Sequence, residues 1–281
     1  MIVDTHVHLT PPRIAAEWRD IAEDEPYFAL LAGSKVHKWG TAEELVARMD
    51  EEGVDEAWAF GFAFRSMELC RECNDYVLDA AKRFPGRIRP LAVVPPLDPA
   101  VESEILRCRN AGCIGVGELF PQGQEWDITD LRQTWRLAGL CDEAGLFLLL
   151  HTAEPVGHDY PGKGNVGPRE AAAFCTNHPE VRVVLAHWGG GLWLYECMPE
   201  MRLVLANAWY DLAASPFLYA PEMLRAASAA GVAHKLLYGS DFPILSRRRY
   251  DRFFDEAALD DSFIRAVLGG NAEELLLGRH V

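Results

Sequence analysis

The sequence predicts a single (β/α)8 barrel over residues 1–281, with a helical insertion after its first strand. Eight short aliphatic or β-branched runs alternate with amphipathic segments along the chain. This alternation is typical of parallel strands joined by right-handed helical crossovers. Eight such units, about 25–55 residues apart, favour a closed barrel over an open doubly wound sheet. The predicted strands are Ile2–His8, Val54–Phe62, Ile88–Val94, Ile114–Leu119, Leu146–His151, Val181–His187, Trp209–Ala213 and Lys235–Gly239.

Helical periodicity and capping residues place helices between these strands. Thr41 precedes one periodic run, and Glu44 completes a capping box that begins a helix over Ala42–Glu52. Asn271 opens a last short helix in the same way. The other predicted helices are Leu69–Arg83, Ala100–Ala111, Leu131–Ala144, Arg169–Asn177, Pro221–Ala230 and Arg248–Ala257.

The longest departure from the alternation is Thr10–Gly40, directly after the first predicted strand. It carries Glu23-Asp24-Glu25 and several aromatic residues. Irregular connections of this length are uncommon in compact domains and usually serve a function. We therefore expect a small helical lid here. No linker or shift in composition divides the rest of the chain, so one domain is expected.

Charge and composition argue against several classes of protein. Lys+Arg is 27 and Asp+Glu is 42, and the resulting net charge of −15 opposes binding to nucleic acid or anionic membranes. No apolar run approaches the roughly 18 residues of a membrane-spanning helix, and Asp4 interrupts any signal peptide. The seven cysteines are scattered, so we expect reduced thiols, the Cys70-x-x-Cys73 pair included, and a cytoplasmic protein. By base rate, a homo-oligomer such as a twofold dimer is expected.

Side chains able to bind metal stand near the carboxyl ends of five predicted strands. In a barrel these ends converge on one mouth, where catalytic groups gather. Two of the residues, His6 and His8, are two positions apart on the first strand and therefore point to the same face. The full set is His6, His8, Glu118, His151, His187 and Asp241.

Six such groups at one mouth favour a metal site over separate structural roles. A single histidine at a strand end is more often a hydrogen-bonded core residue than a ligand. Six of them would each need a buried partner, because unpaired buried imidazoles and carboxylates are costly. One or two divalent cations satisfy all six together, and four imidazoles with two carboxylates suit zinc or a similar first-row metal.

Short motifs surround these residues in a fixed order along the chain. They are Asp4-Thr5-His6-Val7-His8-Leu9, Val116-Gly117-Glu118-Leu119, Leu149-Leu150-His151, Leu185-Ala186-His187-Trp188-Gly189-Gly190-Gly191, Tyr238-Gly239-Ser240-Asp241-Phe242-Pro243 and Gly269-Gly270-Asn271-Ala272-Glu273-Glu274-Leu275. The chain thereby resembles the amidohydrolase superfamily almost from end to end. The closest match is the amidohydrolase-related branch, which contains metal-dependent hydrolases and decarboxylases. The first motif is weak alone, but together with the Gly-Ser-Asp-Phe-Pro motif it is specific.

The resemblance implies a role for each of these residues. It implies a metal held by His6, His8, His151 and Asp241. His187 would be either a ligand of a second ion or an acid that stabilises charge on the substrate. Hydrolases of the superfamily often place a bridging carboxylate where Glu118 stands, whereas its decarboxylases generally lack one. The alternative for Glu118 is a hydrogen-bond acceptor behind the ligands.

These roles predict a metal-dependent hydrolase of an amide, ester or lactone bond in a small, anionic substrate. Water activated by the metal would attack, Asp241 would act as general base, and His187 or the metal would stabilise the oxyanion. The alternative is non-oxidative decarboxylation of an aromatic or unsaturated acid at one ion. A non-catalytic binding protein is a third hypothesis, which the complete ligand set disfavours.

Four further residues are candidates for contact with the substrate. Phe62 and Trp188 are aromatic residues near the mouth, although packing alone explains aromatic residues there equally well. Arg65 is the cation expected to bind an anionic substrate, with a solvated arginine as the alternative. Lys163 ends a near match to a phosphate-binding loop, but Gly164 replaces the required Ser or Thr and no helix follows. We expect instead a lid from which Lys163 reaches the substrate.

Overall fold

Eight parallel strands pair in sequence order in a computed structural model that describes residues 1–35 and 37–278. Every predicted strand is present, and each is shorter than predicted. The strands are β1 (Val3–His8), β2 (Glu56–Phe60), β3 (Ile88–Ala92), β4 (Gly115–Leu119), β5 (Phe147–Leu150), β6 (Val183–Leu185), β7 (Ala208–Asp211) and β8 (Leu236–Leu237).

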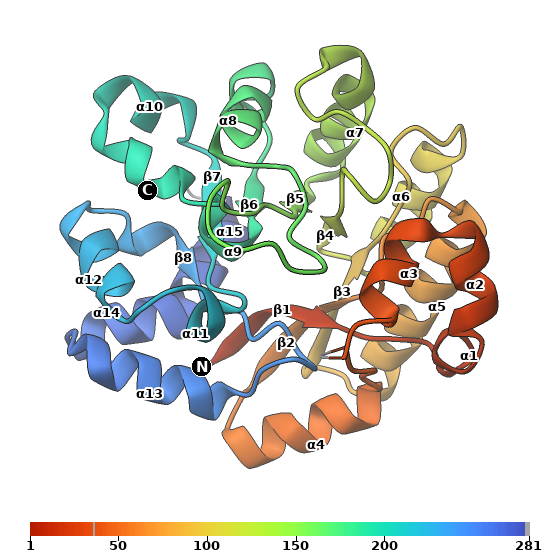
Figure 1. The fold of residues 1–281 in the computed structure, drawn as a ribbon, viewed down its shortest axis with the longest axis horizontal. Helices are drawn as coiled ribbons and strands as arrows, with labels where there is room; N and C mark the ends of the chain where they lie inside the picture. The colour runs from red at the N-terminus through yellow and green to blue at the C-terminus, as the bar shows by residue number, and fades with distance from the viewer. Residues whose placement is uncertain (36, 279–281) are drawn as a thin grey trace.

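The first and last strands meet and complete the barrel. The Thr5 amide donates to the Tyr238 carbonyl, and the His8 amide donates to the Phe242 carbonyl, both at 2.9 Å. Val7 and Phe242 form an isolated parallel bridge beyond the end of β8. Figure 1 shows the helices arranged around the strands. The fold is the predicted (β/α)8 TIM barrel in a single domain.

The helices follow the prediction closely between the strands. The capping box of Thr41 and Glu44 is formed, and the helix after it has the predicted bounds. The predicted last helix from Asn271 is present, but the short helices after β6 and β7 and the one over Asp261–Arg265 were not predicted. The helices outside the insertion are α4 (Ala42–Glu52), α5 (Met67–Arg83), α6 (Val101–Asn110), α7 (Leu131–Ala144), α8 (Pro168–Asn177), α9 (Ala186–Gly189), α10 (Pro199–Val204), α11 (Ser215–Leu218), α12 (Glu222–Ala229), α13 (Arg247–Ala257), α14 (Asp261–Arg265) and α15 (Asn271–Leu277), with short helical segments η1 (Leu192–Cys197), η2 (Ala233–Lys235) and η3 (Ala266–Gly270).

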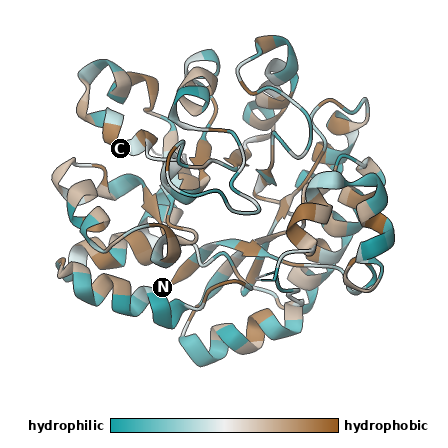
Figure 2. Ribbon diagram, viewed as in Figure 1, coloured by the Kyte–Doolittle hydropathy of each residue, from teal (hydrophilic) through white to brown (hydrophobic). Residues whose placement is uncertain are grey.

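The core lies inside the barrel and between the barrel and its helices. Strands β2, β4 and β5 are buried at every position, and β5 is apolar throughout instead of alternating. Figure 2 shows brown, hydrophobic residues concentrated on the strands and teal residues on the outward helix faces. Polar residues placed at the strand ends are therefore held on a rigid base.

The insertion forms three short helices, as expected, and packs beside the mouth of the barrel. They are α1 (Pro12–Ala16), α2 (Trp18–Asp24) and α3 (Pro26–Ala32). Phe28 of α3 is buried, with ring centroids 5.2 Å from Phe62 and 4.9 Å from Phe64. An ion pair between Arg13 and Glu72 joins α1 to α5. These contacts hold the insertion against the segment that follows β2.

Two expectations about the rest of the chain can also be compared with the structure. No helix in residues 1–35 and 37–278 is long and apolar enough to cross a membrane. All seven cysteines lack a disulfide bond, and six of them are buried. Cys70 and Cys73 lie on α5 in the core, which agrees with the expected thiols.

Candidate metal centre

The six predicted donor residues converge at the carboxyl mouth of the barrel. Four strands supply them directly or through the next few residues, and Asp241 follows β8. His187 and Asp241 have φ angles of 52° and 61°, in the left-handed region that non-glycine residues rarely adopt. Such outliers concentrate at functional sites, where the surrounding structure holds them in place.

The first donor set combines β1 with the segment after β8. The Nε2 atoms of His6 and His8 are 3.3 Å apart, and Asp241 Oδ1 lies 3.4 Å from His8 Nε2 and 3.8 Å from His6 Nε2. Glu118 Oε2 adds a fourth donor, 3.6 Å from His6 Nε2 and 3.5 Å from His8 Nε2. Two ligands of one tetrahedral zinc ion, each about 2.0–2.1 Å from it, are separated by about 3.3–3.4 Å. His6, His8 and Asp241 therefore have the spacing of one ligand sphere, and Glu118 lies within reach of the same two histidines.

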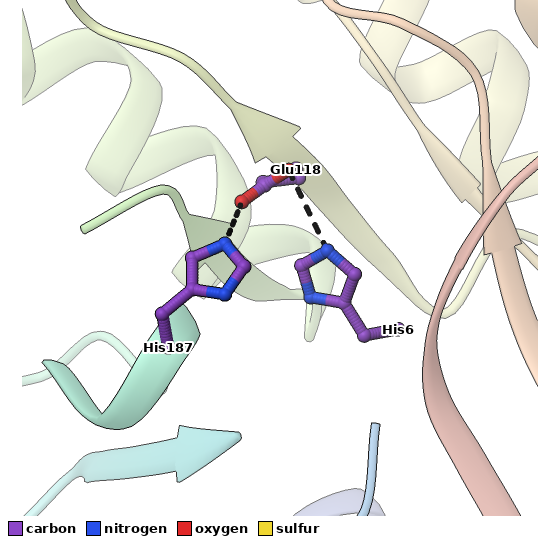
Figure 3. A group of neighbouring side chains, drawn as sticks. All are labelled: His6, Glu118 and His187. Carbon is purple, nitrogen blue, oxygen red and sulfur yellow. Dashed lines mark ion pairs between the residues drawn. The ribbon is translucent and has the colours of Figure 1, made fainter. Parts of the chain in front are cut away.

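The second donor set contacts the other carboxylate oxygen of Glu118. Its Oε1 atom is 2.9 Å from His151 Nδ1 and 3.6 Å from His187 Nε2. Figure 3 shows the imidazoles of His6 and His187 next to each other, each joined by a dashed line to the carboxylate of Glu118. One carboxylate thus offers each of its oxygens to a different group of histidines.

Three of the imidazoles are fixed from outside by hydrogen-bond acceptors. His187 Nδ1 is 3.0 Å from the Ala213 carbonyl, and His151 Nε2 is 3.0 Å from the Lys163 carbonyl. A carbonyl can only accept, so these nitrogens carry the hydrogen. His6 Nδ1 likewise lies 2.8 Å from Asp211 Oδ2. The opposite nitrogen of each neutral ring then turns a lone pair toward the site, which is the arrangement of histidines that bind metal.

The electrostatics of the site call for a cation. Burial raises the pKa of Glu118, but His6 and His151 outweigh this and hold the pKa well below its ordinary value. Burial lowers the pKa of His187, yet hydrogen bonding to Glu118 raises it to about 9. The pKa of Asp241 is lowered despite burial, chiefly by a hydrogen bond from His8. Two ionised carboxylates therefore attract protons to the imidazoles, and a divalent cation would replace those protons.

Asp211 is a site residue that the sequence reasoning missed. It closes β7, is fully buried, and holds His6 through Oδ2. Its Oδ1 accepts hydrogen bonds from the amides of His187 at 2.9 Å and Ala213 at 3.0 Å. It therefore orients donors of both sets. Its position at the end of an apolar strand was the signal that could have revealed it.

A cavity of about 700 Å³ opens above the donors. Such a volume suits a small organic molecule. Phe62 lines this cavity, as predicted, together with the insertion and the loop that contains Tyr160. Trp188 does not line it: the indole is fully buried and donates to Ser215 Oγ at 2.7 Å.

Two cations expected to reach the substrate are used elsewhere. Arg65 donates to the Asp24 carbonyl at 2.5 Å and to Glu125 at 2.6 Å, because the acidic end of α2 lies beside it. Lys163 Nζ donates to the carbonyls of Val156 at 2.8 Å and His158 at 3.1 Å, because its own loop curls around it. Neither residue lines the cavity.

A family model described as Amidohydrolase matches residues 3–277. The chain belongs to the amidohydrolase family. No curated protein matches it.

Solved structures share the fold over nearly the whole chain. A 2,6-dihydroxybenzoate decarboxylase from Rhizobium has a TM-score of 0.72 and 17% identity, covering 98% of both chains. A 5-carboxyvanillate decarboxylase from Novosphingobium aromaticivorans, complexed with manganese and a nitrobenzoic acid, has a TM-score of 0.76 and 15% identity. The match covers 99% of this chain and 96% of that one. A probable 2-pyrone-4,6-dicarboxylic acid hydrolase from Acinetobacter baumannii has a TM-score of 0.65 and 16% identity, covering 98% of both chains. At these identities the likeness establishes the fold.

Proposed function

We propose that this amidohydrolase is a metal-dependent hydrolase that cleaves an amide, ester or lactone bond in a small molecule. The observation that carries the proposal is the position of Glu118 between two donor sets. Its Oε2 atom is 3.5 Å from His8 Nε2, and its Oε1 atom is 2.9 Å from His151 Nδ1. A carboxylate shared in this way suits a pair of ions, as in two-metal hydrolytic sites.

The donor atoms divide between two ions without conflict. His6, His8, Asp241 and Glu118 Oε2 would hold the first, and Glu118 Oε1, His151 and His187 would hold the second. Four imidazole nitrogens and two carboxylates make zinc the first choice. Manganese is the second choice, because a neighbour of the same fold was solved with it. When bound, the ions would lower the pKa of a coordinated water toward about 7 and polarise the substrate oxygen.

The protein's own groups would then position the substrate and move the protons. Asp241 borders the cavity, and its backbone amide donates to the His6 carbonyl at 3.0 Å, which fixes its place. Its carboxylate is the proposed base that accepts the proton of the attacking water and returns it to the leaving group. The insertion and the loop around Tyr160 enclose the cavity and limit entry of bulk water.

Decarboxylation of an aromatic acid is the second candidate, and the comparisons favour it over hydrolysis. Decarboxylases predominate among the neighbours described above, and Phe62, Phe64 and Phe120 line the cavity. The position of Glu118 favours hydrolysis instead, because a carboxylate shared by both donor sets suits a pair of ions. With one divalent ion, Glu118 and Asp241 neutralise the metal and leave no net charge for an acid substrate. Two ions leave a net charge of +2.

A substrate panel on the metal-loaded protein separates the two reactions. One half contains lactones, esters and N-acyl amino acids, and the other contains hydroxybenzoates and enoic acids. We expect hydrolysis in the first half and no release of CO2 in the second. Release of CO2 without any hydrolysis would overturn the proposal in favour of decarboxylation. Elemental analysis of the same sample should give two metal equivalents per chain.

A further inference from the structure

The wall of the cavity has an unusual charge pattern for so acidic a protein. The whole chain has 42 acidic and 27 basic residues. Among the described residues that line the cavity, however, the only acidic ones are Glu118 and Asp241, which belong to the metal centre. Carboxylates are therefore absent from the rest of the described wall, where they would repel an anion.

Two lysines of the insertion lie on this wall at its solvent edge. Lys35 and Lys38 both line the cavity and are exposed. No described acidic side chain forms an ion pair with either of them. Other lysines differ: Lys235 is buried against Glu196 at 2.9 Å, and Lys163 is held by carbonyls of its own loop. Lys35 and Lys38 thus keep their charge available to a molecule in the cavity.

Aromatic side chains line the same cavity as these lysines and the metal centre. Phe28 packs against Phe62 and Phe64, and the ring centroid of Trp39 is 6.1 Å from that of Phe28. All four residues line the cavity. Phe120, which also lines the cavity, stacks on His151 with 3.9 Å between ring centroids. These surfaces suit the flat or apolar middle of a substrate.

His37 lies between the two lysines in sequence and also lines the cavity. Its ring stands edge-on to Trp39, with centroids 4.2 Å apart, and its Nε2 atom is buried without a hydrogen-bond partner among the described residues. Burial lowers its pKa to about 4, so the ring is neutral near pH 7. A buried polar atom without a partner is costly, and a bound ligand group is one way to satisfy it.

We propose that Lys35, His37 and Lys38 form an anion-binding rim that holds a distal carboxylate of the substrate while its reactive bond lies at the metal centre. The substrate class is then an elongated molecule with an aromatic or apolar middle and a carboxylate at the far end. This inference rests on the proposed function for the position of the reactive end. It replaces Arg65 and Lys163 as the source of selectivity for anions.

Calorimetric binding to the zinc-loaded protein tests the rim without requiring turnover. The probes are three rigid diacids of increasing length, terephthalate, naphthalene-2,6-dicarboxylate and biphenyl-4,4′-dicarboxylate, each beside its monoacid. In the wild type we expect at least one diacid to bind about five- to tenfold more tightly than its monoacid, the scale of one or two exposed ion pairs. The double substitution Lys35→Met and Lys38→Met should remove that difference and leave the affinity for the monoacid unchanged.

The matched control is Lys82→Met, because Lys82 is an exposed lysine at the end of α5 and does not line the cavity. It should keep the full preference for the diacid. The inference is overturned if no diacid length is preferred by the wild type, or if the double variant keeps the preference. An equal loss of diacid and monoacid binding in the double variant also overturns it. A preserved preference in a protein that hydrolyses nothing would contradict only the proposed reaction.

Discussion

Two buried glutamates show how differently this chain treats a carboxylate. Glu104 of α6 accepts hydrogen bonds from Arg107 at 2.7 Å, Arg71 at 3.2 Å and Asn74 at 2.8 Å. Burial opposes its ionisation, but Arg107 and Asn74 outweigh burial and lower its pKa to about 2. Glu118, by contrast, faces only imidazoles of the metal centre.

The difference lies in whether the protein itself provides a permanent cation. Arginine is charged at every relevant pH, so Glu104 is neutralised as soon as the chain folds. An imidazole whose outer nitrogen donates a hydrogen bond presents a lone pair on the other side, as His187 does toward Glu118. Such a ring can neutralise a carboxylate only by taking up a proton or by sharing a metal ion. Glu104 is arranged for stability, and Glu118 is arranged for an ion.

The largest expected effect follows from removing the charge of Glu118. We expect Glu118→Gln to bind one metal equivalent where the wild type binds two, because no carboxylate then joins the donor sets. Hydrolysis should fall by about three orders of magnitude, the scale of several kcal/mol of lost charge stabilisation. Elemental analysis and the substrate panel measure both. Two retained equivalents would contradict the bridging role, and Glu104→Gln is the matched control that should keep both ions.

Asp211 should have the next largest effect, although it is not expected to touch the metal. In Asp211→Asn the hydrogen-bond acceptor for His6 Nδ1 is weakened. The ring is then less firmly oriented, and its Nε2 is a weaker metal ligand. We expect metal affinity to fall about 10- to 100-fold, the usual cost of losing such a partner. Titration against a chelator of known affinity measures it. An unchanged affinity would show that the β1 backbone alone orients His6.

Glu104 should affect stability and leave metal binding unchanged. Its ionised form is favoured in the folded protein, so it contributes stability above its ordinary pKa that is lost as the pH falls toward 2. We expect Glu104→Gln to lower the free energy of unfolding by about 2–3 kcal/mol at pH 7. Denaturant unfolding should show the gap between variant and wild type narrowing below about pH 4.5. A gap independent of pH would contradict the ionic explanation.

Arg65 should have the smallest effect of these residues. Its guanidinium is committed to Glu125 and to the Asp24 carbonyl outside the cavity, and pairs as exposed as Arg65–Glu125 contribute about 0–1 kcal/mol. We therefore expect Arg65→Ala to change KM less than about twofold for any substrate that the panel identifies. A rise in KM of tenfold or more would restore it as a contact for the anion.

Much of the fold and the donor set could be predicted because strand ends are local features. A short apolar run that stops at His151 or His187 identifies a strand and its catalytic end at once. The seventh strand carries the same pattern, with Asp211 inside the predicted strand Trp209–Ala213. The barrel order then predicts convergence without knowledge of any loop.

The residues around the cavity could not be predicted in the same way, because loop conformation decides where their side chains point. Arg65 follows β2 directly but turns to the acidic end of α2, and Lys163 is held by the carbonyls of its own loop. Lys35 and Lys38 lie far from every strand in sequence, and long-range contacts such as the packing of Phe28 against Phe62 bring their segment to the cavity. Long-range contacts, not periodicity, set those positions.

The meeting of β1 with the segment after β8 also governs when metal can bind. His6 and His8 precede every other donor residue in the sequence, and Asp241 follows all of them from the other end of the same barrel. The ribosome must release the chain as far as Asp241 before the first ligand sphere exists, so metal uptake belongs to the folded barrel. The ion would then cross-link the first strand to the segment after the last one, and its binding energy would add to the stability of barrel closure.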